Sequence, residues 1–129
     1  MVAIVDDDDS LRSSARLLVA SLGFRSEAFA RAEDFLNSPL LDEASCLILD
    51  VLMPGMNGLE LQRQLLRIRP CLPIIFITAH AKQHEETQAM NAGAFAMLRK
   101  PVAEEILLSA LRTVLNPDAL KGALPIRNF

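Results

Sequence analysis

Short apolar runs alternate with segments of helical period along almost the whole chain, and this alternation constrains the fold more than any other feature. The strand-like runs cover residues 2–5, 24–28, 46–49, 74–77 and 94–98. The helix-like segments cover residues 11–22, 32–37, 58–69, 83–92 and 102–115. Five strand–helix pairs in strict alternation predict a parallel sheet with helices on both of its faces.

Two of the helical segments carry boundary and packing signals. Ser10 is a candidate N-cap for the first helix, and Gly23 can end it. In the segment 58–69, Leu61, Leu65 and Ile68 recur at helical spacing. We therefore expect these three side chains to form one apolar stripe against the sheet.

Acidic residues stand at the ends of two of the predicted strands. A run of four aspartates, 6–9, follows the first strand, and Asp50 closes the third. The carboxyl ends of parallel strands line one edge of a sheet, where ligands bind. Two like unit charges about 4 Å apart repel by about 4 kcal/mol at an effective dielectric constant of about 20. A fold that gathers Asp6, Asp7 and Asp50 at one edge is therefore expected to bind a cation or a proton there. We expect Asp8 and Asp9 to face solvent or the positive end of the first helix, with a water-mediated metal contact of Asp8 as the alternative.

The composition is that of an ordinary globular domain. The 129 residues suit a single core, and 51% are hydrophobic while 22% are charged. A net charge of −3 argues against nucleic-acid binding by this segment. No apolar run reaches the roughly 18–20 residues that span a membrane, and no secretory signal is recognisable, so we expect a cytoplasmic location. Cys46 and Cys71 show neither metal-site nor disulfide spacing.

Four motifs at predicted strand ends occur together in this chain. They are Val5-Asp6-Asp7, the stretch from Asp50 to Gly58, Ile77-Thr78-Ala79 and Lys100-Pro101. With these motifs in this order, the sequence resembles the receiver domain of bacterial two-component response regulators over residues 2–115. The resemblance is closest to receivers of helix-turn-helix transcription regulators. It implies a flavodoxin-like (βα)5 α/β fold, a five-stranded parallel sheet of order 2-1-3-4-5, in which the first and third strands are neighbours.

The resemblance also implies a phosphoacceptor site. Asp50 would accept a phosphoryl group from a sensor histidine kinase, since a carboxylate can act as the nucleophile once its charge is offset. Asp6, Asp7, Asp50 and the backbone carbonyl of Leu52 would hold Mg²⁺, or Mn²⁺ in its place. Such a domain assists its own phosphorylation and dephosphorylation without being a conventional enzyme.

Three further residues receive roles from the same resemblance. Lys100 would place a positive charge on the phosphoryl oxygens, and Pro101, whose peptide bond is cis in the family, would fix the turn that presents it. Thr78 would give its hydroxyl to the phosphoryl group. His80 and His84 are expected to be exposed, although His80 could influence the access of water to the site.

Met97 departs from the family pattern, because many receivers carry Tyr or Phe at this position as a rotamer switch. Phe95 stands two residues earlier. Methionine is flexible and could follow Thr78 into a vacated space, or it could be a passive packing residue. Both interpretations stay open on the sequence.

Phosphorylation is expected to act on a distant face. Thr78 would move toward the phosphoryl group, and the loop 79–82 would follow. The face built from the helix 83–92, the strand 94–98 and the helix 102–115 would then repack, and dimerisation or partner docking through that face would be the output.

The predicted domain division is a receiver over residues 1–116 and a tail or linker over 117–129, leading to an output domain outside this chain. A stand-alone receiver acting by protein contact is the alternative. An aspartyl-phosphate phosphohydrolase is less favoured, because Leu52 stands where such enzymes carry a second acid. An inert receiver-like interaction domain is also disfavoured, because the predicted site residues are all present.

Overall fold

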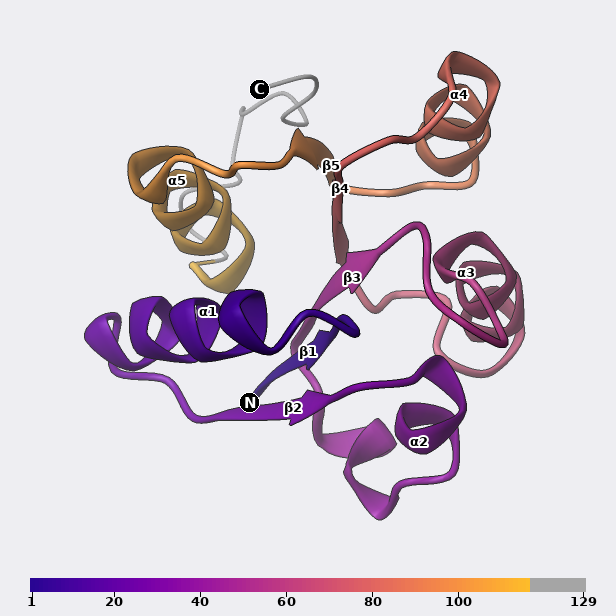
Figure 1. The fold of residues 1–129 in the computed structure, drawn as a ribbon. Coiled ribbons are helices and arrows are strands. Elements are labelled where there is room, and N and C mark those ends of the chain that lie inside the picture. The colour runs from indigo at the N-terminus through magenta and orange to yellow at the C-terminus, as the bar shows by residue number, and fades with distance from the viewer. Residues whose placement is uncertain (117–129) are drawn as a thin grey trace.

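The computed structural model describes residues 1–116, and these residues form a five-stranded parallel sheet in the order β2-β1-β3-β4-β5 (Figure 1). The strands are β1 (Val2–Val5), β2 (Ser26–Phe29), β3 (Cys46–Asp50), β4 (Ile74–Thr78) and β5 (Ala96–Arg99). The predicted fold class and strand order are therefore confirmed. The crossover from β2 to β3 places β1 between these two strands, so β1 lies beside β3, the middle strand of the sheet.

Helices cover both faces of this sheet (Figure 1). They are α1 (Asp9–Ser21), α2 (Ala32–Leu36), α3 (Gly58–Ile68), α4 (Gln83–Asn91) and α5 (Glu104–Leu115), with a 3-10 helix η1 (Pro39–Glu43). The helices α1 and α5 pack on one face, and α2, α3 and α4 lie on the other. The short helix η1 was not predicted, because Ser38-Pro39 indicates a turn as readily as a single turn of helix.

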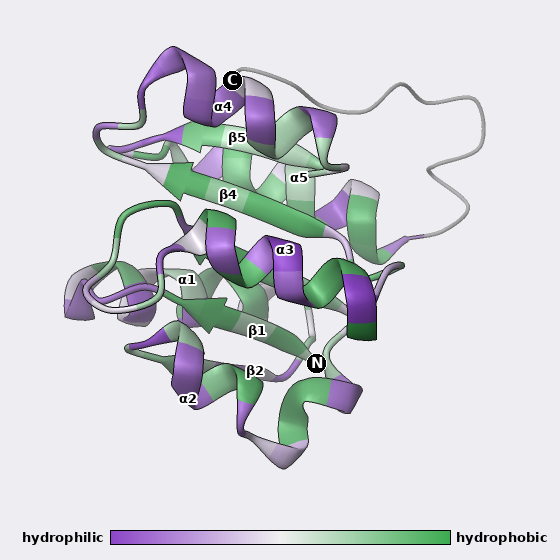
Figure 2. Cartoon of the chain, turned by 90° about the vertical axis from the view of Figure 1, so that its right-hand side faces the viewer, coloured by the Kyte–Doolittle hydropathy of each residue, from purple (hydrophilic) through white to green (hydrophobic). Residues whose placement is uncertain are grey.

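The strands β1, β3 and β4 are fully buried, as expected for parallel strands covered on both faces. The hydrophobic colouring of β1 and β4 in Figure 2 agrees with this burial. Alternate residues point to opposite faces. Ile4 and Ile48 pack toward α1 and α5, whereas Leu47 and Phe76 pack toward α2, α3 and α4. The strands are therefore held from both faces, and their carboxyl ends are fixed relative to one another.

The first helix begins at a different cap from the predicted one. Asp8, not Ser10, is the N-cap of α1, and its Oδ1 accepts hydrogen bonds from the N–H groups of Ser10 and Leu11. A carboxylate at this position also interacts favourably with the positive N-terminal end of the helix dipole, as was expected for Asp8. The helix ends at Ser21, and Gly23 follows with a φ of 87°.

The predicted apolar stripe of α3 is only partly correct. Leu61 and Leu65 are buried against the sheet, but Ile68 is 54% exposed. Leu72 packs into the core at that end of the sheet instead, after the chain has turned back past Arg69. The stripe therefore stops one turn before the end of the helix.

Within residues 1–116, no helix is both long and apolar enough to cross a membrane. The predicted tail or linker, 117–129, lies outside the described residues.

Candidate functional site

The site is built where β1 and β3 end side by side. Their register pairs Val5 with Leu49, so Asp6 follows the last paired residue of β1 and Asp50 is the last residue of β3. Carboxylate oxygens of Asp6, Asp7 and Asp50 all lie within 4.8 Å of one another. Asp6 and Asp50 are buried, and Asp7 is exposed. The fold therefore brings together the three carboxylates that the sequence placed at one sheet edge.

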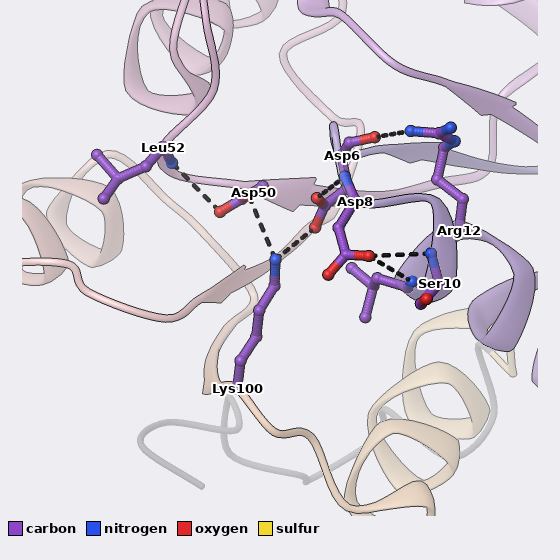
Figure 3. Close-up of polar contacts among 8 residues, drawn as sticks. Asp6, Asp8, Ser10, Arg12, Asp50, Leu52 and Lys100 are labelled. Atoms are coloured by element: carbon purple, nitrogen blue, oxygen red, sulfur yellow. Dashed lines mark hydrogen bonds and ion pairs between the residues drawn. The ribbon is translucent and has the colours of Figure 1, made fainter.

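The Asp6 carboxylate is held from two sides. Its Oδ1 accepts a hydrogen bond of 2.8 Å from the backbone N–H of Asp8, and its Oδ2 lies 2.9 Å from Nζ of Lys100 (Figure 3). Because Asp8 also caps α1, the same short loop fixes both the carboxylate and the start of the helix. Asp6 is thus preorganised before any ligand arrives.

The Asp50 carboxylate points into the same space (Figure 3). Its Oδ1 accepts a hydrogen bond of 3.2 Å from the N–H of Leu52, and its Oδ2 lies 3.4 Å from Nζ of Lys100. The side chain of Lys100 therefore stands between the two buried carboxylates and partly neutralises both.

A close approach of α3 supports Asp50 from behind. A Cβ atom on Gly58 would lie 2.2 Å from the backbone oxygen of Asp50, so only glycine fits. The N–H of Gly58 donates to the carbonyl of Val51 at 2.9 Å. A capping box between Asn57 and Glu60 fixes the first turn of α3 at this point. Gly58 therefore both begins α3 and allows the helix to approach the end of β3.

The electrostatics of the site favour a bound cation. Burial, together with the negative charge of Asp6, raises the pKa of Asp50 to about 6, although Lys100 opposes the rise. Burial lowers the pKa of Lys100, but the hydrogen bond with Asp6 and the charges of both carboxylates outweigh that effect, so the net direction is upward. Carboxylate oxygens are the ligands that hard divalent cations prefer. The acidic cluster could therefore hold a metal ion such as Mg²⁺.

Thr78 and Lys100 come from the neighbouring strand ends. Thr78 is the last residue of β4 and is fully buried, and its Oγ1 has no hydrogen-bond partner among the described residues. The carbonyl of Thr78 accepts the N–H of Lys100 at 2.8 Å, which ties the two together. The Lys100–Pro101 peptide bond is cis. A buried hydroxyl without a partner is costly, so Thr78 is suited to accept a new one.

Met97 lies on the same face of the sheet as Thr78. Met97 pairs with Phe76 in the register of β4 and β5, and Phe76 lies two residues before Thr78. The Met97 side chain is only 1% exposed. Phe95 packs on the opposite face, near α5, so it does not substitute for the missing aromatic residue. His80 is exposed. The roles predicted for these residues remain predictions.

Two further residues that the sequence singles out, Leu52 and His84, are both exposed. Leu52 is 43% exposed in the loop after Asp50, and the predicted use of its carbonyl as a metal ligand stays a prediction. His84 is exposed on α4. Cys46 is buried in β3 and burial raises its pKa to about 12, while Cys71 is exposed, and both are free.

Arg12 was missed from the sequence although it contacts the site. Its guanidinium donates to the backbone carbonyl of Asp6 at 2.7 Å (Figure 3). The sequence does contain an indication of this contact. Arg12 is a basic residue three positions after Asp9, in the first turn of a helix that follows an acidic run.

Comparisons with known proteins agree with this geometry. Residues 2–112 match the family described as response regulator receiver domain. The response regulator protein TmoT of Ectopseudomonas mendocina is 43% identical over 115 residues, which cover 89% of this chain and 52% of TmoT. The transcriptional regulatory protein TdiR of Thauera aromatica is 37% identical over 114 residues, covering 88% of this chain and 50% of TdiR. The chain thus spans about half the length of these curated relatives.

A solved structure also has a similar fold. The low-resolution structure of the response regulator StyR superimposes with a TM-score of 0.81 at 44% sequence identity. The match covers 94% of this chain and 61% of the StyR chain.

Proposed function

Because the chain belongs to the response regulator receiver domain family, we propose that it accepts a phosphoryl group on Asp50 from a sensor histidine kinase. The observation that carries the proposal is the position of the Asp50 carboxylate. Oxygens of Asp6 and Asp7 lie within 4.8 Å of it, and the Lys100 ammonium lies 3.4 Å from it and 2.9 Å from Asp6.

The three carboxylates of Asp6, Asp7 and Asp50 fit a Mg²⁺ ion, and together with the Leu52 carbonyl they would be its protein ligands. When bound, the ion supplies positive charge to the carboxylates and to the incoming phosphoryl oxygens. The buried Asp6 and Asp50 carboxylates repel one another, and Lys100 offsets only part of that repulsion. This residual negative charge is what supports a dication at the site.

The transfer step needs only a positioned nucleophile and charge stabilisation. An oxygen of Asp50 forms a bond to phosphorus while the bond from phosphorus to the imidazole nitrogen of the kinase breaks, and that nitrogen keeps the electron pair. The product is an acyl phosphate. Lys100 then shifts from the Asp50 and Asp6 carboxylates to an oxygen of the phosphoryl group, which needs little movement because it already lies between them.

Signal output begins at Thr78 in this proposal. Its buried hydroxyl, which has no hydrogen-bond partner within residues 1–116, gains one when the phosphoryl oxygens arrive, so the phosphorylated state favours an inward position of this side chain. Met97 lies on the same face of the sheet as Thr78. It either follows Thr78 into the space that Thr78 vacates or remains a passive packing residue. The loop 79–82 then carries the change to the start of α4.

The face formed by α4, β5 and α5 is the proposed output surface. The buried residues of α4 are Glu86 and Ala89, with Met90 packed against the core, so this helix buries fewer residues than α3 does. Gln62 of α3 donates from Nε2 to the carbonyl of Ala89 at 2.9 Å, and Arg99 of β5 forms an ion pair with Glu86 at 2.5 Å. A helix attached in this way can shift at modest cost.

We assign the downstream role to transcription regulation in a longer cytoplasmic protein, with homodimerisation through the α4-β5-α5 face as the response. The sequence relationship to TmoT and TdiR supports this assignment. A stand-alone receiver that acts through protein contacts is the alternative. Phosphohydrolase activity toward a separate substrate is not favoured, because Leu52 carries no acid to protonate a leaving group.

The proposal is tested by intact-mass spectrometry after incubation with acetyl phosphate and Mg²⁺. We expect one added phosphoryl group on the wild-type protein and none on Asp50→Ala. Asp34→Ala, which removes an exposed carboxylate from α2, is the matched control and should be phosphorylated like the wild type. Equal labelling of wild type and Asp50→Ala would refute the assignment of Asp50.

A second measurement separates the two modes of output. Molar mass by light scattering is compared with and without beryllofluoride and Mg²⁺, which mimic the phosphorylated state. Dimerisation supports self-association through the α4-β5-α5 face. An unchanged mass together with unchanged amide spectra of that face would contradict the proposed output mechanism.

A further inference from the structure

Arg12 links the first helix to the backbone of the acidic cluster. Its Nη1 donates to the carbonyl of Asp6 at 2.7 Å (Figure 3). Its Nη2 forms an ion pair with the Asp9 carboxylate. The Arg12 side chain is only 20% exposed, whereas that of Asp9 is 90% exposed. The guanidinium therefore lies against the protein and holds an acceptor at each end of its fork.

The carbonyl that Arg12 contacts belongs to the peptide unit joining two proposed metal ligands. The oxygen of Asp6 and the nitrogen of Asp7 share one rigid plane. The register of β1 with β2 and with β3 ends at Val5, so the Asp6 carbonyl lies beyond the paired part of the strand. Arg12 supplies the hydrogen bond that a strand partner would otherwise give.

Asp7 depends most on this peptide. The Asp6 carboxylate is also fixed by Asp8 and Lys100, but Asp7 is exposed, so its position follows from the backbone that carries it. Rotation of the Asp6–Asp7 peptide would swing the Asp7 carboxylate away from the other two. The orientation of this one peptide therefore decides whether three oxygens converge.

We propose that Arg12 is a positioning residue for the divalent cation site, holding the Asp6–Asp7 peptide in the orientation that aims the Asp7 carboxylate at the ion. This inference rests on the proposed function, because it concerns the cation that phosphorylation of Asp50 requires. Groups that orient metal ligands from outside the coordination sphere typically change metal affinity by about 10- to 100-fold.

Charge and position predict opposite effects of removing Arg12. A positive charge near the site repels a dication, so its loss alone would tighten Mg²⁺ binding. Loss of the hydrogen bond to Asp6 frees the peptide and weakens binding. The sign of the change in affinity therefore separates a positioning role from a purely electrostatic one.

The test is an NMR titration of the backbone amides of the full chain with Mg²⁺. The chain has no tryptophan or tyrosine, so intrinsic fluorescence of those residues is no substitute. Arg12→Gln is compared with Arg16→Gln, which removes the same charge from an exposed position one turn further along α1. Circular dichroism verifies that each variant is folded.

We expect Arg12→Gln to bind Mg²⁺ about tenfold more weakly than the wild type, with Arg16→Gln within about twofold of it. Unchanged or tighter binding by Arg12→Gln, or an equal loss in both variants, would overturn the positioning role while leaving the proposed function intact. Failure of the wild type to bind Mg²⁺ would instead defeat the proposed function itself.

Arg12→Lys decides the question if Arg12→Gln does not fold. Lysine keeps the charge, but a single ammonium cannot hold the Asp6 carbonyl and the Asp9 carboxylate with the geometry of a guanidinium fork. We expect severalfold weaker Mg²⁺ binding in this variant. An affinity equal to that of the wild type would overturn the proposal.

Discussion

Nζ of Lys100 lies closer to the carboxylate of Asp6, at 2.9 Å, than to that of Asp50, at 3.4 Å. In this structure, the lysine therefore compensates Asp6, the most buried acid of the site, as well as Asp50, the proposed phosphoacceptor. An ammonium group in this place occupies the same oxygens that a divalent cation would use. Lys100 and Mg²⁺ are thus expected to compete before phosphorylation and to cooperate after it.

Replacement of Lys100 by glutamine should tighten Mg²⁺ binding while slowing phosphorylation. A unit charge about 4 Å away contributes about 1 to 4 kcal/mol depending on the local dielectric, so an affinity increase of about tenfold or more is expected. Mg²⁺ titrations by NMR and labelling rates with acetyl phosphate measure the two effects. Lys82→Gln, which removes an exposed lysine, is the control. Weaker Mg²⁺ binding by Lys100→Gln would contradict the competition.

The stability of the metal-free protein should fall as the pH rises through the range between the ordinary pKa of an aspartate and about 6. The folded state holds a proton on Asp50 up to about pH 6, whereas the unfolded chain releases it near 3.8. The folded state therefore binds more protons in this window, and the stabilisation is full below it and lost above it. Mg²⁺ should restore more stability at pH 8 than at pH 5.

The Asp50→Asn variant isolates this contribution from those of the other carboxylates. Thermal unfolding in the presence of a chelator is followed at a series of pH values for both proteins. We expect the variant to be the more stable protein at pH 8 and to lose the difference as the pH falls below the folded pKa. A difference that is constant with pH would show that Asp50 titrates normally.

The fold and the main acids of the site were predictable because they depend on patterns that a chain displays locally. Apolar runs of four or five residues ending in Asp6, Asp50 or Thr78 locate both the central strands and the edge where they end. The strand order came from the family resemblance, because the alternation of strands and helices is compatible with more than one order. Once the strand order is known, the sheet itself brings residues that are far apart in the sequence to the same edge.

Contacts made through backbone atoms could not be predicted in the same way. Arg12 donates to the carbonyl of Asp6, and Gln62 donates to the carbonyl of Ala89. Because every residue has a backbone carbonyl, the identity of the accepting residue does not indicate that such a contact exists. The helix start was mistaken because Asp8 and Ser10 are both good N-caps, and only the loop geometry chooses between them. Ile68 continues the helical spacing of Leu61 and Leu65, but it is exposed, because Leu72 packs into the core at that end of the sheet.

Replacement of Gly58 by alanine should destabilise the protein although its backbone conformation suits any residue. The added Cβ would lie 2.2 Å from the backbone oxygen of Asp50, so α3 must move away from the end of β3. We expect a loss of about 1–3 kcal/mol in the free energy of unfolding, and slower phosphorylation of the displaced Asp50.

Gly23→Ala is the matched control for this effect. Gly23 has a φ of 87° and open space around its Cβ position, so its replacement costs backbone strain of about 1–2 kcal/mol without touching the site. Urea unfolding gives both free energies, and acetyl phosphate labelling gives the rates. Normal labelling of a folded Gly58→Ala protein would show that α3 does not position Asp50.

The replacement of Gln62 by leucine should loosen α4 selectively. The buried amide of Gln62 is the hydrogen-bond link from α3 to the end of α4 at Ala89. Its removal should increase hydrogen exchange of the α4 amides while leaving β1 and β3 protected. Gln64→Leu, at an exposed position of the same helix, is the control and should exchange like the wild type. Uniform protection in Gln62→Leu would mean that α4 is held by its other contacts.

Thr78→Val should stabilise the unphosphorylated protein and impair its response. Valine has nearly the shape of threonine but no hydroxyl, and the Oγ1 of Thr78 is buried without a hydrogen-bond partner among the described residues. Burial of an unpaired hydroxyl costs about 1–3 kcal/mol, so its removal should raise the free energy of unfolding by an amount in that range. Thr113→Val is the control, because the hydroxyl of Thr113 donates to the carbonyl of Ser109 and its loss brings no gain.

The same substitution should uncouple phosphorylation from its output. Asp50 and Lys100 keep their positions in Thr78→Val, so beryllofluoride and Mg²⁺ should still bind, but no hydroxyl is left to follow the bound group. We expect amide shifts near Asp50 without the shifts on α4 and β5 that the wild type shows. Retention of the full α4 response would mean that the change passes through another group, and a loss of stability in Thr78→Val would mean that the hydroxyl already has a partner before phosphorylation.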